Sequence, residues 1–231
     1  MIEALARAAK LLAEPARAAV LVRLMNGRAV PAGELALVAH VSPQTASEHL
    51  ARLAEAGFVT VRRQGRHRYY ELANEEVAYA VESLMVLSSA SQARSRAVGV
   101  IPALGTFEHA RTCYAHLAGW LGVAITDALQ QKGYLAPVPG RAFAVTDCGK
   151  AWFEQRGIAI ANPTKVPDRT FARQCPDWTE RRPHLAGPLG VAIYKRFSEL
   201  RWIAPTRKSR NIRVTLEGRK ALLKNLHIVV G

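Results

Sequence analysis

The segment SPQTASEHLARLAEAGFVTVRRQGRHRYYEL, residues 42–72, decides the fold of the first part of the chain. Ser42 followed by Pro43 is typical of a helix N-terminus, because a serine side chain caps the helix and proline fits its first turn. The apolar residues that follow recur at the spacing of one buried helix face: Ala46, Leu50 and Leu53. Two alternating runs, 58–63 and 68–72, then flank a Gln-Gly turn, which predicts a β-hairpin.

Helical patterns surround this segment on both sides. Upstream, the sequence predicts helices over 4–12, 16–25 and 31–39, and downstream it predicts an amphipathic helix over 75–86. A helix, a turn, a second helix and a basic hairpin follow one another in the winged helix-turn-helix. There the second helix enters the major groove of DNA, while the hairpin lies along the backbone or the minor groove. The first part of the chain is therefore predicted to bind double-stranded DNA.

We expect the side chains that contact DNA to lie on the second helix and on the hairpin. The helix carries short hydrogen-bonding groups, which suit base edges and phosphates, and the hairpin tip concentrates four arginines. The predicted DNA-binding residues are Ser42, Gln44, Thr45, Ser47, His49, Arg52, Arg62, Arg63, Arg66, His67 and Arg68. For the hairpin, a solvated charged turn is the alternative interpretation.

The first part of the chain resembles the ArsR/SmtB family of bacterial transcriptional repressors. The resemblance covers about residues 5–90. It rests on four short motifs: Leu12-Ala13-Glu14-Pro15-Ala16-Arg17, Glu34-Leu35-Ala36, Ser47-x-His49-Leu50 and Gly57-Phe58-Val59. The resemblance implies a homodimer paired through its first and last helices, here about 3–12 and 75–88, that binds a pseudo-palindromic operator.

The metal sites of that family have no counterpart in these ninety residues. The arsenic type needs cysteines in the third helix, which here contains only Glu, Leu, Ala and Val over 34–39. The cadmium or lead type needs thiols in the recognition helix, which has none over 52–56. The zinc type needs Asp/His pairs in the last helix, whereas 75–85 offers only carboxylates. We therefore expect any sensor to lie elsewhere in the chain.

The charge of the chain is distributed unevenly. Its 32 Lys and Arg against 18 Asp and Glu give a net charge of +14, which favours an anionic partner such as nucleic acid. Residues 1–90 contain ten basic and nine acidic side chains, whereas residues 91–231 contain 22 and nine. This change of character near the polar stretch 88–92 predicts two domains, residues 1–92 and 93–231.

Several classes of protein are excluded by simple features of the sequence. The longest apolar runs fall far short of the about 18 residues that a membrane span needs, and the start, MIEALARAAK, lacks the basic flank of a signal peptide. Three cysteines are too few, and odd in number, for a secreted disulfide scaffold. No glycine-rich phosphate loop, activated-serine elbow or paired-carboxylate motif is present. We expect a cytoplasmic protein that is not an enzyme and has no membrane partner.

The second part of the chain contains an internal duplication. The sequence HLAGWLGVAI, residues 116–125, recurs as HLAGPLGVAI, residues 184–193, with nine of ten positions identical. The match extends to a Thr-x-x-Gly motif, at residues 146–149 and again at 215–218. So close a match is typical of a duplicated structural unit.

The two repeats, about 110–157 and 172–226, are each expected to form a helix, a strand, a basic turn, a strand and a helix. Their first helices are predicted over 123–131 and 191–200, and the threonine of each Thr-x-x-Gly motif is expected to cap the closing helix. Since about 50 residues alone make a marginal core, we expect the repeats to pack as one domain rather than as two separate units. The predicted fold class is mainly α with small β-wings (α+β): an N-terminal winged helix-turn-helix followed by a C-terminal domain of two winged-helix-like repeats.

Cysteine and histidine stand together at the start of both repeats. An Ala-Arg-x-Cys motif precedes each His-Leu-Ala-Gly motif, which gives the pairs Cys113/His116 and Cys175/His184. Because Cys113 and His116 are three residues apart, we expect them on one helical face or turn. Two thiolates with one or two imidazoles would suit a divalent soft or borderline metal, namely zinc, cadmium or lead.

Two other interpretations of these residues stay open. The thiols of Cys113 and Cys175 would form a reversible redox disulfide, with neighbouring arginines lowering their pKa. Alternatively, the cysteines are small buried hydrophobes and the histidines cap the following helices. Cys148, which has no counterpart in the second repeat, is interpreted as structural.

Two further sites are predicted in the second part. Trp178 with Arg181 and Arg182 would line a pocket for a small anionic ligand, the tryptophan stacking on it and the arginines pairing with its acid group. The basic run over 195–213 is interpreted either as an auxiliary contact to DNA or another anion, or as a solvated charged face.

These features lead to two hypotheses about function. The first is a homodimeric bacterial repressor whose C-terminal domain senses an effector, which is a soft metal, a thiol-reactive compound or a small anionic ligand. The alternative is a non-sensing architectural DNA binder that uses both domains to hold DNA. Operator binding that responds to metals, thiol oxidants or acids would separate the first from the second.

Overall fold

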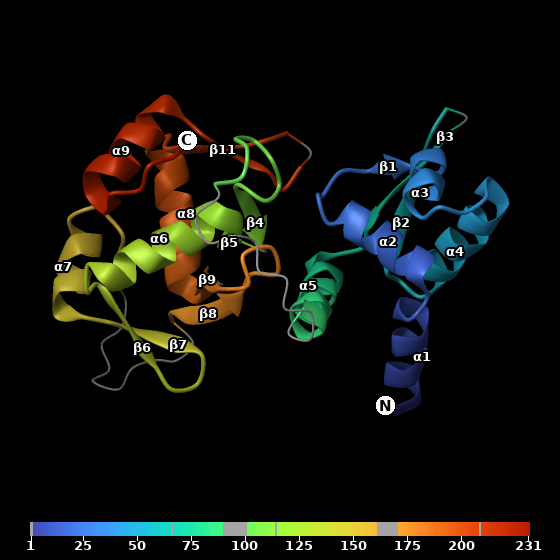
Figure 1. Cartoon of the computed structure of the whole chain (residues 1–231), viewed down its shortest axis with the longest axis horizontal. Helices are drawn as coiled ribbons and strands as arrows, with labels where there is room; N and C mark the ends of the chain where they lie inside the picture. The colour runs from blue at the N-terminus through green and yellow to red at the C-terminus, as the bar shows by residue number, and fades with distance from the viewer. Residues whose placement is uncertain (1, 66, 90–100, 114, 161–170, 208) are drawn as a thin grey trace. The chain divides into compact units, whose positions relative to one another are not determined.

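The computed structural model describes residues 2–65, 67–89, 101–113, 115–160, 171–207 and 209–231 (Figure 1). The chain divides into two compact units, one formed by Met1–Glu82 with Arg207–Ser209 and the other by Ser83–Thr206 with Arg210–Gly231. We call them the N-terminal and the C-terminal unit. Within the described parts of the chain, no helix has the length and apolar character that crossing a membrane requires.

The N-terminal unit contains the predicted order of a winged helix-turn-helix. Three strands form an antiparallel sheet in the order β1-β3-β2, and β2 and β3 make the hairpin, or wing. The elements are α1 (Ile2–Leu12), α2 (Pro15–Leu24), β1 (Val30–Pro31), α3 (Ala32–Val38), α4 (Pro43–Glu55), β2 (Val59–Gln64), β3 (His67–Leu72) and, up to Glu82, the first part of α5 (Glu75–Ser89).

Local chemistry explains why α4 begins where it does. The Ser42 side chain accepts a hydrogen bond from the Thr45 backbone N–H at 3.1 Å, and Pro43 occupies the first helical position. The predicted apolar face of this helix is buried: Ala46, Leu50 and Leu53. The opposite face of α4 is left to solvent, as a helix that reads DNA requires.

The C-terminal unit contains two halves with the same order of elements: hairpin, helix, hairpin and helix. The first half contains β4 (Arg111–Cys113), β5 (His116–Ala118), α6 (Gly119–Gln131), β6 (Leu135–Val138), β7 (Ala142–Val145) and α7 (Asp147–Glu154). The second half contains β8 (Arg173–Pro176), β9 (Pro183–Ala186), α8 (Gly187–Glu199), β10 (Ile203–Pro205), β11 (Ile212–Val214) and α9 (Leu216–Leu226). The likeness of each half to a winged helix stays a prediction.

The two halves share one hydrophobic core. Buried side chains from the first half, such as Leu121 and Phe153, belong to the same cluster as Leu189, Phe197 and Leu222 from the second. Strands β6, β7, β8 and β9 also form one antiparallel sheet that joins the halves. The halves therefore fold together and are not two separate small units.

The structure corrects the predicted start of both repeats. The helices predicted over 123–131 and 191–200 begin four residues earlier, at Gly119 and Gly187, and each is preceded by a hairpin that was not predicted. Both glycines have a positive φ, +73° and +78°, which lets the strand turn directly into the helix. The hairpin strands are only three or four residues long, too short to give an alternating pattern.

The Thr-x-x-Gly motif closes each half in the same way. Thr146 and Thr215 are the predicted helix caps, and each accepts a hydrogen bond from the backbone N–H of the motif's glycine, at 3.0 and 2.9 Å. A Cβ atom at Gly149 would lie 2.1 Å from the carbonyl oxygen of the preceding hairpin's Tyr134. Thus the threonine starts the helix, and the glycine lets it pack against the hairpin backbone.

Candidate functional site

The outward face of α4 carries the first part of the candidate DNA interface. Gln44, Ser47 and Arg52 are exposed there, on the side opposite the buried leucines. The Ser47 hydroxyl donates to the carbonyl of Pro43 at 2.9 Å, so that its orientation is fixed within the helix. Gln44 stands at the N-terminal end of the helix, which is the end that a recognition helix directs at base edges.

Other predicted contacts on α4 have roles inside the unit. Ser42 and Thr45 hydrogen-bond each other through their hydroxyls at 2.9 Å, next to the cap that Ser42 provides. His49 is half-buried, and its Nδ1 lies 3.2 Å from Nη1 of Arg17. Arg17 is itself buried and donates to the carbonyl of Leu11 at 2.6 Å. The structure therefore places His49 in an internal contact, whereas the sequence indicated a DNA contact.

The wing carries the second part of the candidate interface. Arg62, Arg63, His67 and Arg68 are exposed on β2 and β3, and Arg63 stands opposite Arg68 across the hairpin. Arg62 forms an ion pair with Glu71, which reduces the charge that it offers to a phosphate. Arg66 lies outside the described residues.

The four predicted metal or redox residues converge in the C-terminal unit. One donor atom from each lies within 4.8 Å of all the others: Cys113, His116, Cys175 and His184. The two sulfur atoms are 3.9 Å apart, and the two Nε2 atoms are 3.1 Å apart. All four side chains are at most 9% exposed. The sequence thus identified the members of this cluster correctly, although nothing in it gave their distances.

The backbone that presents these side chains differs from the prediction. Cys113 and His116 are opposite each other on the antiparallel strands β4 and β5, and Cys175 and His184 on β8 and β9. The expected helical face is absent, because a cysteine three residues before a histidine also fits the two ends of a tight hairpin. The six additional residues in the second copy form the longer loop between β8 and β9.

Close helix packing brings the two hairpins together. Helix α6 packs against β9 of the other half, and α8 packs against β5. A Cβ atom at Gly122 would lie 3.4 Å from the Cβ of His184, and one at Gly190 would lie 3.2 Å from the Cβ of His116. Each half therefore supports the histidine of the other. The repeated His-Leu-Ala-Gly-x-Leu-Gly sequence encodes this crossed arrangement.

A buried ion pair lies behind His184. Asp177, in the loop between β8 and β9, accepts hydrogen bonds at 2.9 Å from Arg111 on both carboxylate oxygens. The side chains of Arg111 and Asp177 are 1% and 0% exposed. The Asp177 Oδ2 atom also lies 3.1 Å from Nδ1 of His184 and accepts from the Gly119 backbone N–H at 2.8 Å. One carboxylate thus links both hairpins and orients one histidine.

The two histidines have opposite electrostatic environments. Burial, together with the nearby positive charges of His184 and Arg173, lowers the pKa of His116 to about 3. Burial alone would also lower the pKa of His184, but the hydrogen bond and the charge of Asp177 outweigh it and raise that pKa to about 9. Burial alone would raise the pKa of Asp177, whereas its hydrogen bond to His184 and the charge of Arg111 hold it well below the ordinary value.

Comparison with known proteins assigns the chain to a family. The family described as a helix-turn-helix domain matches residues 12–62. The chain is also 40% identical over 226 residues to the uncharacterized HTH-type transcriptional regulator YdfF of Bacillus subtilis, an alignment that covers 98% of each protein. The chain belongs to the ArsR-type helix-turn-helix transcriptional regulators.

Other similarities cover a smaller part of this ArsR-type regulator. It is 37% identical over 82 residues to the HTH-type transcriptional regulator CmtR of Mycobacterium bovis, covering 36% of this chain and 69% of CmtR. The solution structure of the homodimeric winged helix-turn-helix DNA-binding domain of Mb0332, also from Mycobacterium bovis, is 31% identical. It covers 38% of this chain and 81% of that domain, with a TM-score of 0.36. The alignment with YdfF, in contrast, includes the C-terminal unit.

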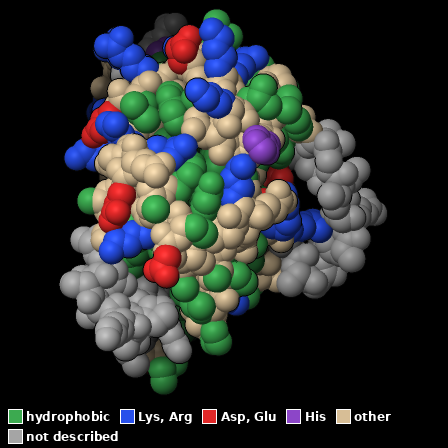
Figure 2. Space-filling model, turned by 90° about the vertical axis from the view of Figure 1, so that its left-hand side faces the viewer, with side chains coloured by type: hydrophobic (Ala, Val, Ile, Leu, Met, Phe, Trp, Pro, Cys, Tyr) green, Lys and Arg blue, Asp and Glu red, His purple; other side chains and the backbone are tan. Residues whose placement is uncertain are grey.

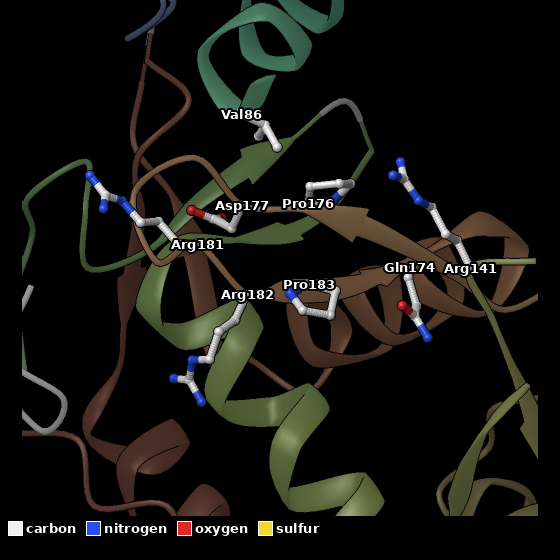
Figure 3. A pocket seen from close by; sticks show the side chains of 8 residues that line it. All are labelled: Val86, Arg141, Gln174, Pro176, Asp177, Arg181, Arg182 and Pro183. Carbon is white, nitrogen blue, oxygen red and sulfur yellow. The ribbon is translucent and has the colours of Figure 1, made fainter. Parts of the chain in front are cut away.

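The predicted ligand pocket of the regulator is only partly assembled as expected. Arg181 and Arg182 line a pocket of about 320 Å³ together with Arg141, Gln174, Pro176 and Pro183 (Figure 3). Arg182 forms an ion pair with Asp127. Trp178 is not among the lining residues, because its ring faces Phe107 and Arg111 instead. The three residues therefore do not form one binding site for an acid.

Some of the arginines in the C-terminal unit form hydrogen bonds with backbone carbonyls of the same unit. Arg196 donates to the carbonyl of Arg156 at 2.6 Å, and Arg210 donates to that of Thr112 at 2.9 Å, whereas Lys208 lies outside the described residues. On the face shown in Figure 2, Lys and Arg side chains are spread among apolar and acidic ones and do not form one continuous patch. Cys148, interpreted from the sequence as structural, is exposed, and its thiol donates to the carbonyl of Gly133.

Sequence reasoning did not predict the internal contacts of three buried charged residues. Arg17, Arg111 and Asp177 are buried charged side chains with several hydrogen bonds each. The sequence holds one signal for Arg17, which is the arginine of the Leu-x-Glu-Pro-x-Arg motif. Arg111 and Asp177 are 66 residues apart in the sequence, and no local pattern indicates that they form a pair.

Proposed function

We propose that this regulator is a homodimeric repressor that reads a pseudo-palindromic operator through α4 and the wing. The observation that carries the proposal is the outward face of α4, where Gln44, Ser47 and Arg52 stand exposed beside a basic hairpin. Amide and guanidinium groups are the side chains that bind adenine and guanine edges in the major groove. The repressor role comes from the resemblance to the ArsR/SmtB family.

Exposed apolar side chains on the first and last helices support the homodimer. Helix α1 has no buried residue within one chain, and its Leu5 is 72% exposed. On α5, Tyr79 is 58% exposed. An amphipathic helix normally buries its apolar face, so that a partner surface is needed here. A second copy of the chain, paired through α1 and α5, would supply it and would place two copies of α4 about one DNA turn apart.

We further propose that effector sensing belongs to the C-terminal unit. The family's thiol sites are missing from residues 1–90, whereas two cysteines and two histidines meet in the C-terminal unit. An effector that binds the free and DNA-bound forms with different affinity would change operator binding. The architectural alternative, in which both units hold DNA without sensing, is favoured by the basic run over 195–213.

Replacing Gln44 tests the recognition helix. We expect Gln44→Ala to weaken operator binding by about 1–3 kcal/mol per half-site, because alanine cannot form the bidentate hydrogen bonds that a glutamine makes to a base. Fluorescence anisotropy would measure this on a duplex that the wild-type protein selects from a random pool. Gln131→Ala, at an exposed glutamine at the end of α6, is the matched control and should leave affinity unchanged. Equal affinities of wild type and Gln44→Ala would contradict the assignment of α4 as the reading helix.

Replacing the wing arginines tests the phosphate contacts. We expect Arg63→Gln and Arg68→Gln each to make the plot of log affinity against log salt shallower, by about 0.9 for every phosphate that the variant no longer neutralises. Base preference should not change, since phosphate contacts carry no sequence information. An unchanged slope would exclude the wing from the interface. Arg213→Gln, at an exposed arginine in the C-terminal basic run, separates the two hypotheses, because a shallower slope for it would favour the architectural binder.

A further inference from the structure

We propose that the C-terminal unit holds one divalent cation of the zinc class in a closed site of four protein ligands: Cys113, His116, Cys175 and His184. The site joins the hairpin β4–β5 of the first half to the hairpin β8–β9 of the second. It differs in place and ligands from the metal sites of the resembling family, none of which has a counterpart in residues 1–90.

The distances between the donor atoms fit a tetrahedron. With Zn–S bonds of about 2.3 Å, two thiolates in tetrahedral geometry are about 3.8 Å apart, and the sulfur atoms of Cys113 and Cys175 are 3.9 Å apart. With Zn–N bonds of about 2.0–2.1 Å, two imidazole nitrogens are about 3.3–3.4 Å apart. The Nε2 atoms of His116 and His184 are 3.1 Å apart. The thiol pair and the imidazole pair thus each have a spacing close to that of a tetrahedral site, and all four donors lie within 4.8 Å of one another.

The competing interpretations account for fewer of these observations. A reversible disulfide is compatible with free thiols 3.9 Å apart, but it assigns no role to the two histidines that stand beside them. Cysteines that serve only as small hydrophobes explain the burial of the thiols, but they leave two buried imidazole nitrogens directed at each other beside them. A cation bound by all four donors accounts for the placement of the thiols and the imidazoles together.

The surroundings of the cluster suit a zinc-class ion and a clamping role. Two thiolates and two imidazoles are the ligand set of closed, four-coordinate zinc sites, which contribute directly to folding. His184 presents Nε2 to the cluster while its Nδ1 lies 3.1 Å from Asp177, the arrangement by which a carboxylate orients a ligating histidine. The small residues Ala118 and Ala186 pack beside the thiols and close the site to solvent. Binding would release the thiol protons of Cys113 and Cys175 to the solvent.

This inference specifies one effector class for the proposed sensing, but the metal site itself does not depend on DNA binding. If the chain binds the ion but its operator affinity does not change, the metal site is supported and the metal-sensing role is excluded. If the chain binds DNA but no ion, the metal site is excluded and the proposed repressor function still stands. Metal binding is therefore measured on the full chain without DNA.

The direct test is the stoichiometry of metal binding. We expect the reduced, full-length protein to bind one equivalent of Zn²⁺ per chain and to bind Co²⁺ with the strong visible absorption of a tetrahedral thiolate complex. Cys113→Ser and Cys175→Ser should each lose this absorption and weaken Zn²⁺ binding at least 100-fold. Cys148→Ser is the matched control, since its thiol is exposed and outside the cluster, and it should bind as the wild type does.

A second measurement on the wild-type chain does not require the variants to fold. Removing Zn²⁺ with a chelator should lower the melting temperature of the C-terminal unit by about 5–10 °C, and adding Zn²⁺ back should restore it. Three results would overturn the proposal: less than stoichiometric binding, equal loss of binding in Cys148→Ser, or a Cys113–Cys175 disulfide in the protein handled under argon with Zn²⁺ present.

Discussion

Replacing Arg111 by methionine is expected to lower the free energy of unfolding of the C-terminal unit by about 3–5 kcal/mol. The change removes the guanidinium that donates to both oxygens of Asp177 and leaves that carboxylate buried. A buried charge without its partner is far more costly than the pair, because the solvation lost on burial is no longer offset. The nearby His184 compensates only in part, since its Nδ1 faces one of the two oxygens.

Tryptophan fluorescence during urea unfolding would measure this effect selectively, because all four tryptophans lie in the C-terminal unit: Trp120, Trp152, Trp178 and Trp202. Arg182→Met is the matched control. Its guanidinium pairs with Asp127 at the surface, where side-chain exposures of 52% and 31% limit the pair to about 0–1 kcal/mol. Wild type and variants are compared at one Zn²⁺ concentration. Equal losses of stability in Arg111→Met and Arg182→Met would show that burial of the pair has no special consequence.

The fold of the N-terminal unit could be predicted from the sequence because its signals are local. The Ser42-Pro43 start, the spacing of Ala46, Leu50 and Leu53, and the Gln-Gly turn each specify one element within a few residues. The structure has the corresponding helix at Pro43–Glu55 and the hairpin at Val59–Leu72. The side-chain roles on α4 were less predictable. His49 is positioned by Arg17, which is 32 residues away and buried.

In the C-terminal unit, by contrast, the arrangement of the site depends on contacts between residues far apart in the sequence. The duplication was visible in the sequence and identified the cysteines and histidines of the cluster, but the geometry that unites them arises from crossed packing of α6 and α8 on the opposite hairpins. The hairpin strands are only three or four residues long, too short for an alternation of apolar and polar residues to be recognised. The three-residue spacing of Cys113 and His116 was therefore interpreted as a helical face or turn, although the two ends of a hairpin have the same spacing.

The six-residue insertion gives the two repeats different chemistry. It creates the loop that carries Asp177, which pairs with Arg111 of the other half and faces His184. His116 has the same place in the first repeat, yet its pKa is lowered where that of His184 is raised. The two equivalent histidines thus have unequal environments, and the Asp177 carboxylate contributes to the difference. The duplication alone predicts symmetry, which the insertion breaks.

The largest loss of operator affinity is expected from separating the dimer, through Leu5→Glu. Two symmetry-related glutamates would be buried against apolar helices at the proposed α1–α5 interface, so that the chain should become a monomer. A dimer gains about 100- to 10,000-fold in affinity by holding two half-sites at once. We therefore expect the affinity for the full operator to fall by about that factor. Binding to a duplex with one half-site should change little.

Sedimentation equilibrium would measure the oligomeric state, and anisotropy would measure binding to both duplexes. Leu216→Glu, at a leucine of α9 that is 67% exposed against 72% for Leu5, is the matched control and should stay dimeric. Circular dichroism should show the same helix content for both variants, because Leu5 is not part of the core of its own chain. A Leu5→Glu chain that stays dimeric would mean that α1 lies outside the interface. The exposed apolar face of α1 would then need a different partner, since no residue of α1 is buried by the described part of its own chain.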